Sequence, residues 1–333
     1  MADHVDHGVL VRYAASKVNI PTEQAASRRA QVGRLRTGLE TYIASHLDYD
    51  LVKLRASGST AKHTAIRRRA GEGSDADVAA YVKAVTVGGT DAPEEGLLDW
   101  LLARCKEVYG RNKDADDFFV SDHAVAITMI GTGLKIDVAP VLYEGEPDDR
   151  GHLVTRQGDR VLTSVTQHLS FLNTRKRAAG SGYAELIRLL KAWIREGKRT
   201  TDDLRCKSFI LELLVAHLWD VGWNGEALNV NNYPRAFEQI LGYVVRTGLR
   251  EQVSFTTYYE TCDISASSDP IRIWDPVNPD NNVARTYTDT DRIRLVAFAA
   301  SSLEEIAWAA QATTKGAAND AWLNIFGPGF EGA

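Results

Sequence analysis

Hydrophobic residues recur along the chain with two different periods, and the dominant period changes near the middle. In the first half, alternation of apolar and polar positions predicts strands at 51–56, 75–84, 120–130 and 134–142. The tripeptide Gly131-Thr132-Gly133 predicts a hairpin between the last two strands. Helical spacing surrounds these strands, at about 6–48 with a break at Pro21, and around Leu97 to Cys105.

The second half is dominated by helical spacing. Apolar stripes predict helices at 162–179, 183–196, 204–221, 234–247 and 289–310. We therefore expect an α+β protein in which a lobe with a mixed sheet, residues 1–150, packs on a mostly helical lobe, residues 151–333. The first helices of the chain are expected to pack back onto this second lobe.

Composition narrows the class of protein. Hydrophobic residues make up 44% and charged residues 25% of the chain, as in ordinary globular proteins. The net charge of -5 and the pI of about 5.9 argue against a long basic surface, so we expect no obligatory nucleic-acid activator. The sequence shows neither a signal peptide nor an apolar run long enough to span a bilayer, which predicts a cytoplasmic protein without a membrane partner.

Three aspartates stand out because of where they lie in the predicted strands. Asp75 and Asp77 are two residues apart, so a strand points both toward the same face. In the strand from 134 to 142, the apolar residues share one face, which leaves Lys135 and Asp137 on the other. If these two strands are neighbours, the three carboxylates converge on one surface.

Converging carboxylates indicate a metal site. They raise one another's pKa unless a cation neutralises them, and hard oxygen ligands suit Mg²⁺ or Mn²⁺. Two such ions about 3.5–4 Å apart can stabilise the attacking and leaving oxygens of an in-line displacement. We therefore assign Asp75, Asp77 and Asp137 as metal ligands and catalytic residues of a two-metal phosphoryl transfer enzyme.

A Gly-Ser turn before the first aspartate fits the same chemistry. Gly58 would let the backbone approach a phosphate, and Ser59 adds a hydroxyl group and an amide. Lys62, about one turn later, could face the same phosphates. These three residues are candidate nucleotide ligands.

The combination Gly58-Ser59, Asp75-x-Asp77 and Asp137 resembles the polymerase-beta-like nucleotidyltransferases. Within them, the chain is most similar to the 2′-5′ oligoadenylate synthases, to the bacterial CD-NTases of CBASS antiphage defence, and to their relative, animal cyclic GMP-AMP synthase. The similar segments are 58–67, 74–77, 186–193, 208–214 and 275–283. Two departures are the longer loop before Asp75 and His63, which stands where a glycine is common.

The resemblance implies further nucleotide ligands in the second half. Lys191, Lys207 and Ser208 would bind the donor triphosphate, and Asn282 would line the nucleotide site. The residues agree in part, since Lys191 belongs to a basic stripe beside an apolar one, and Lys207 and Ser208 lie near the start of a predicted helix.

The implied function is template-independent synthesis of a cyclic or short linear oligonucleotide second messenger from NTPs, with ATP among the substrates, in CBASS defence. Effector and regulatory proteins would be partners, and the small residues Gly332-Ala333 would permit conjugation of the C-terminus. Two alternatives fit the same residues. One is a linear 2′-5′ oligoadenylate synthase, or a transferase acting on RNA or protein; the other is an inactive nucleotide-binding module.

Overall fold

The computed structural model describes residues 4–43, 49–69, 73–87, 90–91, 96–146 and 148–330. The chain divides into two compact units. Residues 20–170 form one, here called the sheet unit, and residues 1–19 with 171–333 form the other, the helical unit. This differs from the expected boundary near residue 150, because two strands after that point still extend the sheet.

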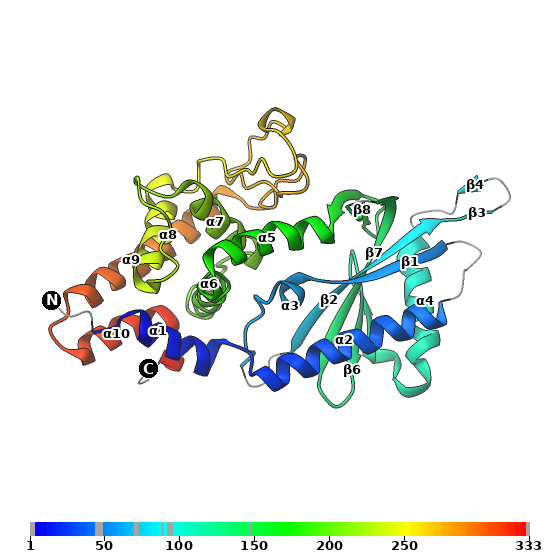
Figure 1. Cartoon of the computed structure of the whole chain (residues 1–333), viewed down its shortest axis with the longest axis horizontal. Helices are drawn as coiled ribbons and strands as arrows, with labels where there is room; N and C mark the ends of the chain where they lie inside the picture. Colours follow the sequence, from blue (N-terminus) through cyan, green and yellow to red (C-terminus); the bar gives the residue numbers. More distant parts are fainter. Residues whose placement is uncertain are drawn as a thin grey trace. The chain divides into compact units, whose positions relative to one another are not determined.

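Within the described residues, seven strands of the sheet unit form one sheet. Its central order is β1-β2-β7-β6-β5, and β8 and β9 continue it by pairing with β7 and with each other (Figure 1). Their bounds are β1 Tyr49–Ser57, β2 Ser74–Ala84, β5 Phe118–Val120, β6 Val125–Met129, β7 Leu134–Gly145, β8 Arg150–Val154 and β9 Arg160–Ser164. A separate small ladder joins β3 Thr86–Val87 to β4 Thr90–Asp91.

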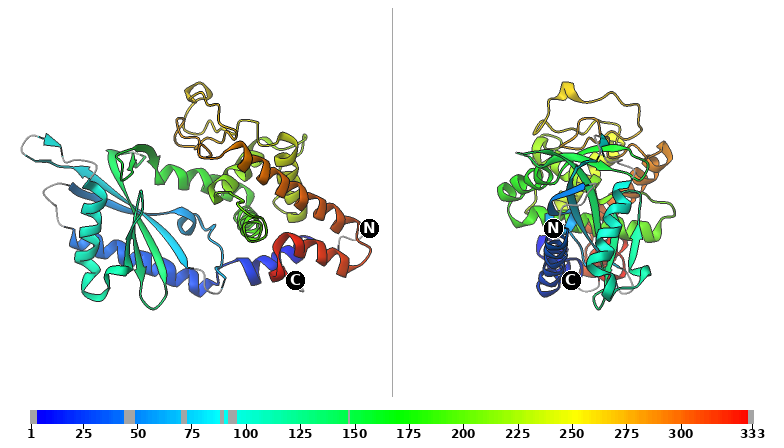
Figure 2. Two further views of the ribbon diagram at one scale, coloured as in Figure 1. Left: turned by 180° about the vertical axis from the view of Figure 1, so that it is seen from behind. Right: turned by 90° about the vertical axis from the view of Figure 1, so that its right-hand side faces the viewer.

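Two helices cover one face of this sheet: α2, Thr22–Tyr42, and α4, Leu97–Tyr109 (Figures 1 and 2). Alternate residues of β2 and β7, such as Val78 and Ile136, enter the same buried cluster as the apolar residues of these helices. Burial of this face fixes which residues of β2 and β7 point away from it.

The opposite face is divided along the strands. At one end, Tyr81 and Val141 are buried under Val165, the first residue of α5, Val165–Ala179. At the other end lie the shorter polar side chains of the two strands. Beside the buried end, Lys53 of β1 forms an ion pair with Asp149, which also accepts hydrogen bonds from Arg55 and Thr166. Burial opposes ionisation of Asp149, but these partners lower its pKa below the usual range.

The helical unit begins with the N-terminal residues of the chain. Its N-terminal elements are α1 His7–Tyr13 and a π-helical turn Ala14–Val18. Its later helices are α6 Ser181–Thr200, α7 Ser208–Val221, α8 Tyr233–Thr247, α9 Asp289–Gln311 and α10 Lys315–Phe326. Tyr13 of α1 packs on Phe326 and Phe330, with ring centroids 4.8 and 5.0 Å apart. The helices α1 and α10 lie side by side (Figures 1 and 2). The first and last described segments therefore share one core.

Several predicted elements differ from the observed ones. The predicted strand 120–130 is two strands, β5 and β6, separated by a turn at 121–124. The helix predicted from residue 162 begins at Val165, since residues 160–164 pair with β8. The helix α10 was not predicted. Within the described ranges, no helix has both the length and the apolar character needed to cross a membrane.

Candidate active site

The three aspartates lie on one face of two neighbouring parallel strands. In the register of β2 and β7, Asp77 is directly opposite Asp137, and Asp75 is opposite Lys135. The intervening residues Ala76 and Val78 are buried in the core on the other face. The expectation that these strands are neighbours is confirmed. The local reason is the alternation itself, because burial of the apolar residues forces the carboxylates onto the open face.

Gly58 lies in contact with one of these carboxylates. Ser57, the last residue of β1, is registered with Asp77, and the chain then turns into the short helix α3, Gly58–Lys62. Gly58 has φ 61°, and a Cβ built on it would lie 1.8 Å from Asp77 Oδ2. Both the left-handed backbone and the close approach require glycine. The Gly-Ser turn is thus placed beside Asp77.

His63 ends α3 in a left-handed conformation, with φ 59° and ψ 30°. This explains why a glycine would be favoured at the position, since a residue with a Cβ adopts that conformation at a cost. The longer loop before Asp75 includes residues 70–72, which lie outside the described residues.

Cationic side chains flank the aspartates within the described part of the sheet unit. Arg68 forms an ion pair with Asp75, and Lys135 Nζ lies 3.5 Å from Asp137 Oδ1. Partial burial raises the pKa of Asp137, the Asp75 carboxylate raises it further, and Lys135 lowers it. Neither cation was singled out from the sequence as part of the site, although the position of Lys135 on the same face was a usable signal.

The donor atoms fit a hard divalent cation, because three carboxylates share one face and the charge of Asp75 disfavours ionisation of Asp137. As the side chains lie, no three acidic, histidine or cysteine groups of the described residues are arranged to hold a metal ion. Arg68 pairs with one oxygen of Asp75, and Lys135 pairs with one oxygen of Asp137. A bound cation would compete with these two side chains for the carboxylates.

Lys191 and Ser208 belong to the helical unit, on α6 and α7. Lys191 is 5% exposed and its Nζ lies 2.6 Å from Glu212 Oε1. Glu212 is one turn after Ser208 on α7, so this ion pair holds the Lys191 ammonium beside the first turn of that helix. The helix begins at Ser208, four residues after the predicted start at 204, and ends at Val221 as predicted.

Lys207 precedes α7 in a cluster of positive charge. Burial lowers the pKa of Lys207, and the charges of Arg285 and Arg205 lower it further. Its backbone N–H donates to the Tyr287 hydroxyl at 2.7 Å. Three cations near one helix start favour an anion. Arg205 and Arg285 were not identified from the sequence, because neither belongs to a recognisable motif.

Both polar atoms of the Asn282 side-chain amide form hydrogen bonds within the protein. Its Oδ1 accepts hydrogen bonds from the backbone N–H groups of Ile273 and Ala284, and its Nδ2 donates to Asp269 and to the carbonyl of Ile271. At 3% exposure, it holds this loop together. A direct contact between Asn282 and a nucleotide would break one of these bonds.

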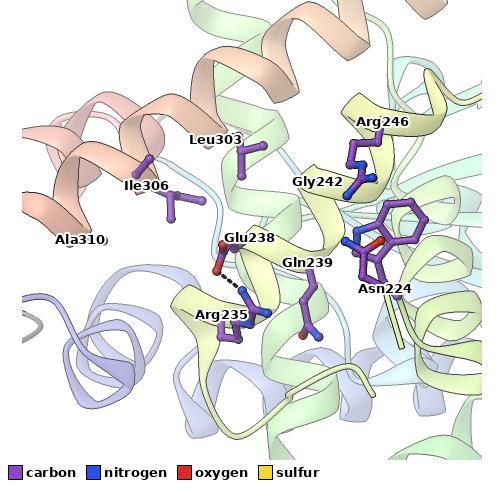
Figure 3. A pocket seen from close by; sticks show the side chains of 11 residues that line it. Asn224, Arg235, Glu238, Gln239, Gly242, Arg246, Leu303, Ile306 and Ala310 are labelled. Atoms are coloured by element: carbon purple, nitrogen blue, oxygen red, sulfur yellow. Dashed lines mark hydrogen bonds and ion pairs between the residues drawn. The ribbon is translucent and has the colours of Figure 1, made fainter. Parts of the chain in front are cut away.

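A pocket of about 350 Å³ lies elsewhere in the helical unit, between α8 and α9 (Figure 3). Of its three labelled charged residues, Arg235 and Glu238 point toward each other and form an ion pair with an N–O distance of 2.5 Å, and Arg246 is the third. A single paired carboxylate is a poor cation site, so this pocket does not compete with the aspartates as the catalytic centre.

Known proteins resemble the chain over nearly its whole length. A cyclic AMP-AMP-AMP synthase from Escherichia coli strain MS 115-1 is 39% identical, with 99% of each chain covered. A CBASS oligonucleotide cyclase, CdnC, from Escherichia coli strain KTE188 is 30% identical over 96% of each chain. The chain belongs to the CD-NTase family. This CD-NTase is therefore a nucleotidyltransferase related to the oligonucleotide cyclases of CBASS.

Further comparisons agree with this assignment. Residues 154–323 match the family of the 2′-5′-oligoadenylate synthetase 1 C-terminal domain 2. The solved structure of E. coli MS115-1 CdnC with ATP superimposes with a TM-score of 0.87 over 99% of this CD-NTase and 100% of that chain. Vibrio cholerae DncV, at 14% identity and a TM-score of 0.68 over 97% and 95% of the two chains, shares the fold. Divalent metals are used generally in the CD-NTase family.

Proposed function

We propose that this CD-NTase joins adenylate units from ATP into a cyclic trinucleotide, with Asp75, Asp77 and Asp137 binding the required divalent cations. The observation that carries this proposal is the register of β2 and β7, which sets Asp77 against Asp137 on an open face. The product follows from the 39% identical relative, a cyclic AMP-AMP-AMP synthase, and the substrate from the CdnC structure that contains ATP.

In each proposed step, a hydroxyl of the acceptor nucleotide attacks the α-phosphorus of the donor. A new P–O bond forms between this hydroxyl oxygen and the α-phosphorus. The bond between the α-phosphorus and the oxygen that bridges to the β-phosphate breaks, and pyrophosphate and a proton leave. Mg²⁺ or Mn²⁺ held by the three aspartates would neutralise the triphosphate and lower the pKa of the attacking hydroxyl. The chain itself supplies positioning, since β2 and β7 fix the carboxylates before substrate binds.

The donor nucleotide is assigned to Gly58 and Ser59, whose turn lies beside Asp77. Lys62, at the end of α3, is close in sequence and is assigned to the same phosphates. In the helical unit, Lys191, Lys207 and Ser208 are proposed to bind the triphosphate. Their support is the basic cluster before α7 and the ion pair that holds Lys191 at the first turn of this helix.

A regulatory partner is proposed from one relative. The structure of a complex between CdnC from E. coli MS115-1 and HORMA-deltaN superimposes on this chain with a TM-score of 0.86 at 39% identity. We therefore propose a HORMA-domain protein as a partner, and a CBASS effector as the receiver of the product. Conjugation through Gly332-Ala333 stays a prediction, because these residues lie outside the described residues.

The test is product identification. Purified protein is incubated with all four NTPs and Mg²⁺ or Mn²⁺, alone and with a HORMA-domain partner, and phosphatase-treated products are identified by mass spectrometry. A phosphatase-resistant mass of three cyclised adenylates is expected. Linear oligomers would favour the oligoadenylate synthase alternative instead.

The site is tested by substitution of two aspartates. Asp75→Asn combined with Asp77→Asn should abolish nucleotide transfer while circular dichroism and the melting temperature show a folded protein. Undiminished turnover in this double variant would refute the proposed metal site. Absence of any transfer by the wild-type protein, with or without the partner, would favour the inactive binding module.

A further inference from the structure

An exposed aromatic ring lies on the same face of the sheet as the three aspartates. Phe119 is registered with Ala126, Ala126 with Asp137, and Asp137 with Asp77. Residues paired in this way point to the same face, so one row crosses the sheet from Asp77 to Phe119. The neighbours of Phe119 on β5, Phe118 and Val120, pack on the core of the opposite face, which independently fixes the direction of Phe119.

The row ends in an exposed aromatic ring. Phe119 is 61% exposed, whereas Ala126, between Phe119 and Asp137, is a small residue that is 3% exposed. Two strand spacings separate Phe119 from Asp137, roughly 10 Å. This is the reach of one nucleotide, with its sugar at the carboxylate and its base on the ring.

The Lys135 side chain lies close to both Asp137 and Phe119. Its Nζ lies 3.5 Å from Asp137 Oδ1 and 5.8 Å from the centroid of the Phe119 ring. If a metal ion displaces Lys135 from Asp137, the Lys135 ammonium remains tethered on the same face, because Lys135 is two residues from Asp137 on β7 and is opposite Asp75. A single exposed apolar residue is common on protein surfaces. An aromatic ring beside a cation, in register with a catalytic carboxylate, is a more specific arrangement.

The direction of the reaction decides which nucleotide lies there. The proposed donor phosphates lie at Gly58 and Ser59, which follow β1 on one side of the aspartates. In an in-line displacement, the attacking oxygen approaches from the side opposite the leaving pyrophosphate. The side opposite β1 in the sheet order is that of β6 and β5, where Phe119 lies.

We propose that Phe119 is the stacking residue for the base of the acceptor nucleotide, with Lys135 beside it. This proposal rests on the proposed function of the three aspartates. An aromatic face accepts any base, so Phe119 would supply affinity for a nucleobase and leave the choice of base to other residues.

The test separates acceptor from donor. The donor is 2′,3′-dideoxy-ATP, which lacks an attacking hydroxyl, and the varied acceptor is AMP, which lacks a pyrophosphate leaving group. Phe119→Ala should raise the KM for AMP on the order of tenfold, because stacking stabilises a bound base by that order. The KM for the donor should not change, and Phe119→Tyr should restore the KM for AMP.

Ile130→Ala is the matched control, because Ile130 is 67% exposed and follows β6 outside the row. A binding measurement makes the result independent of turnover. AMP and ribose 5-phosphate, which has no base, are titrated calorimetrically in Mg²⁺. Phe119→Ala should weaken the binding of AMP and leave the binding of ribose 5-phosphate unchanged. Equal affinity of wild type and Phe119→Ala for AMP would overturn the proposal, while loss of transfer in the Asp75→Asn, Asp77→Asn variant tests the aspartates separately.

Discussion

Gly58 shows at the scale of one residue how backbone conformation and side-chain position are linked in the proposed site. Its left-handed φ and its contact with Asp77 place a glycine where any other residue would displace this proposed metal ligand. We predict that Gly58→Ala lowers the rate of nucleotide transfer on the order of 100-fold, since a displacement of about 1 Å at a reacting centre can cost that much. Steady-state transfer kinetics provide the measurement.

Gly133→Ala is the matched control for Gly58→Ala. Gly133 has a nearly equal φ, 62°, but a Cβ built there has no heavy atom within 4 Å. The strained backbone should cost each variant roughly 1–2 kcal/mol of stability, and Gly58→Ala should lose more because its Cβ also meets Asp77. Equal rates of transfer in the two variants would show that contact with Asp77 has no catalytic consequence.

The ionised Asp137 carboxylate is expected to serve catalysis but to lower the stability of the folded protein. Burial and the neighbouring Asp75 raise its pKa, so the folded protein binds a proton at Asp137 more readily than the unfolded chain. The ionised group therefore costs folding free energy at neutral pH, and this cost is lost as the pH falls through the raised pKa.

We predict that Asp137→Asn raises the melting temperature at pH 7 in EDTA while abolishing transfer. The difference from wild type should disappear below about pH 4, where the carboxyl is protonated in both states. Thermal melts over a pH series measure this. Asp75→Asn, which removes the partner of Arg68, should not raise the melting temperature, and an identical gain there would contradict the explanation.

The aspartates were predictable at this scale because alternation fixes the face of every strand residue. Arg68 was not, because it lies in a loop where no period relates residue number to direction. Phe119 was missed as well. Its direction depends on the pairing of β5 with β6, and the predicted single strand 120–130 did not contain that pair.

At the scale of elements, the ion pair between α6 and α7 contributes to stability and also contains Lys191, a proposed triphosphate ligand. Lys191 and Glu212 are both buried, so replacement of one removes the buried counter-charge of the other. We predict that Glu212→Gln lowers the free energy of unfolding by about 3–5 kcal/mol. Denaturant titration monitored by circular dichroism measures this change.

A double replacement separates the two roles of this pair. Lys191→Met combined with Glu212→Leu replaces both charges by apolar groups and should recover most of the stability. If Lys191 binds the triphosphate, the KM for ATP should stay elevated in this double variant. A normal KM for ATP would limit Lys191 to a structural role.

The sequence did not predict the elements whose apolar residues lack a strong helical or strand periodicity. The strands β8 and β9 have five residues each, and the apolar residues of β9 resembled the start of the following helix. The turn between them contains Gly158 with φ 87°, which was an available signal. For α10, the N-cap Thr314, whose side chain accepts from Ala317 N, was another.

At the scale of the whole chain, the N-terminal residues are part of the C-terminal core. Tyr13 is 3% exposed and packs on Phe326 and Phe330. We predict that Tyr13→Ala lowers the free energy of unfolding of the helical unit by about 3–5 kcal/mol, as large aromatic deletions do. Hydrogen exchange should show lost protection in α10 and unchanged protection in β2.

Tyr42→Ala is the control, because Tyr42 is 58% exposed at the end of α2 in the sheet unit. This replacement should alter stability by less than about 0.5 kcal/mol. Lost protection in β2 on replacement of Tyr13 would mean that the units do not respond separately.

The division of the chain also sets an order of events during synthesis. Residues 1–19 are synthesised before residues 20–170, but their packing partners, residues 171–333, are synthesised after them. The intervening residues 20–170 include the whole seven-stranded sheet of the described chain, and their translation takes roughly 8–30 seconds at 5–20 residues per second. The nascent chain can therefore assemble its aspartate-bearing sheet while Val9, Leu10 and Tyr13, which are buried in the finished helical unit, still lack their packing partners.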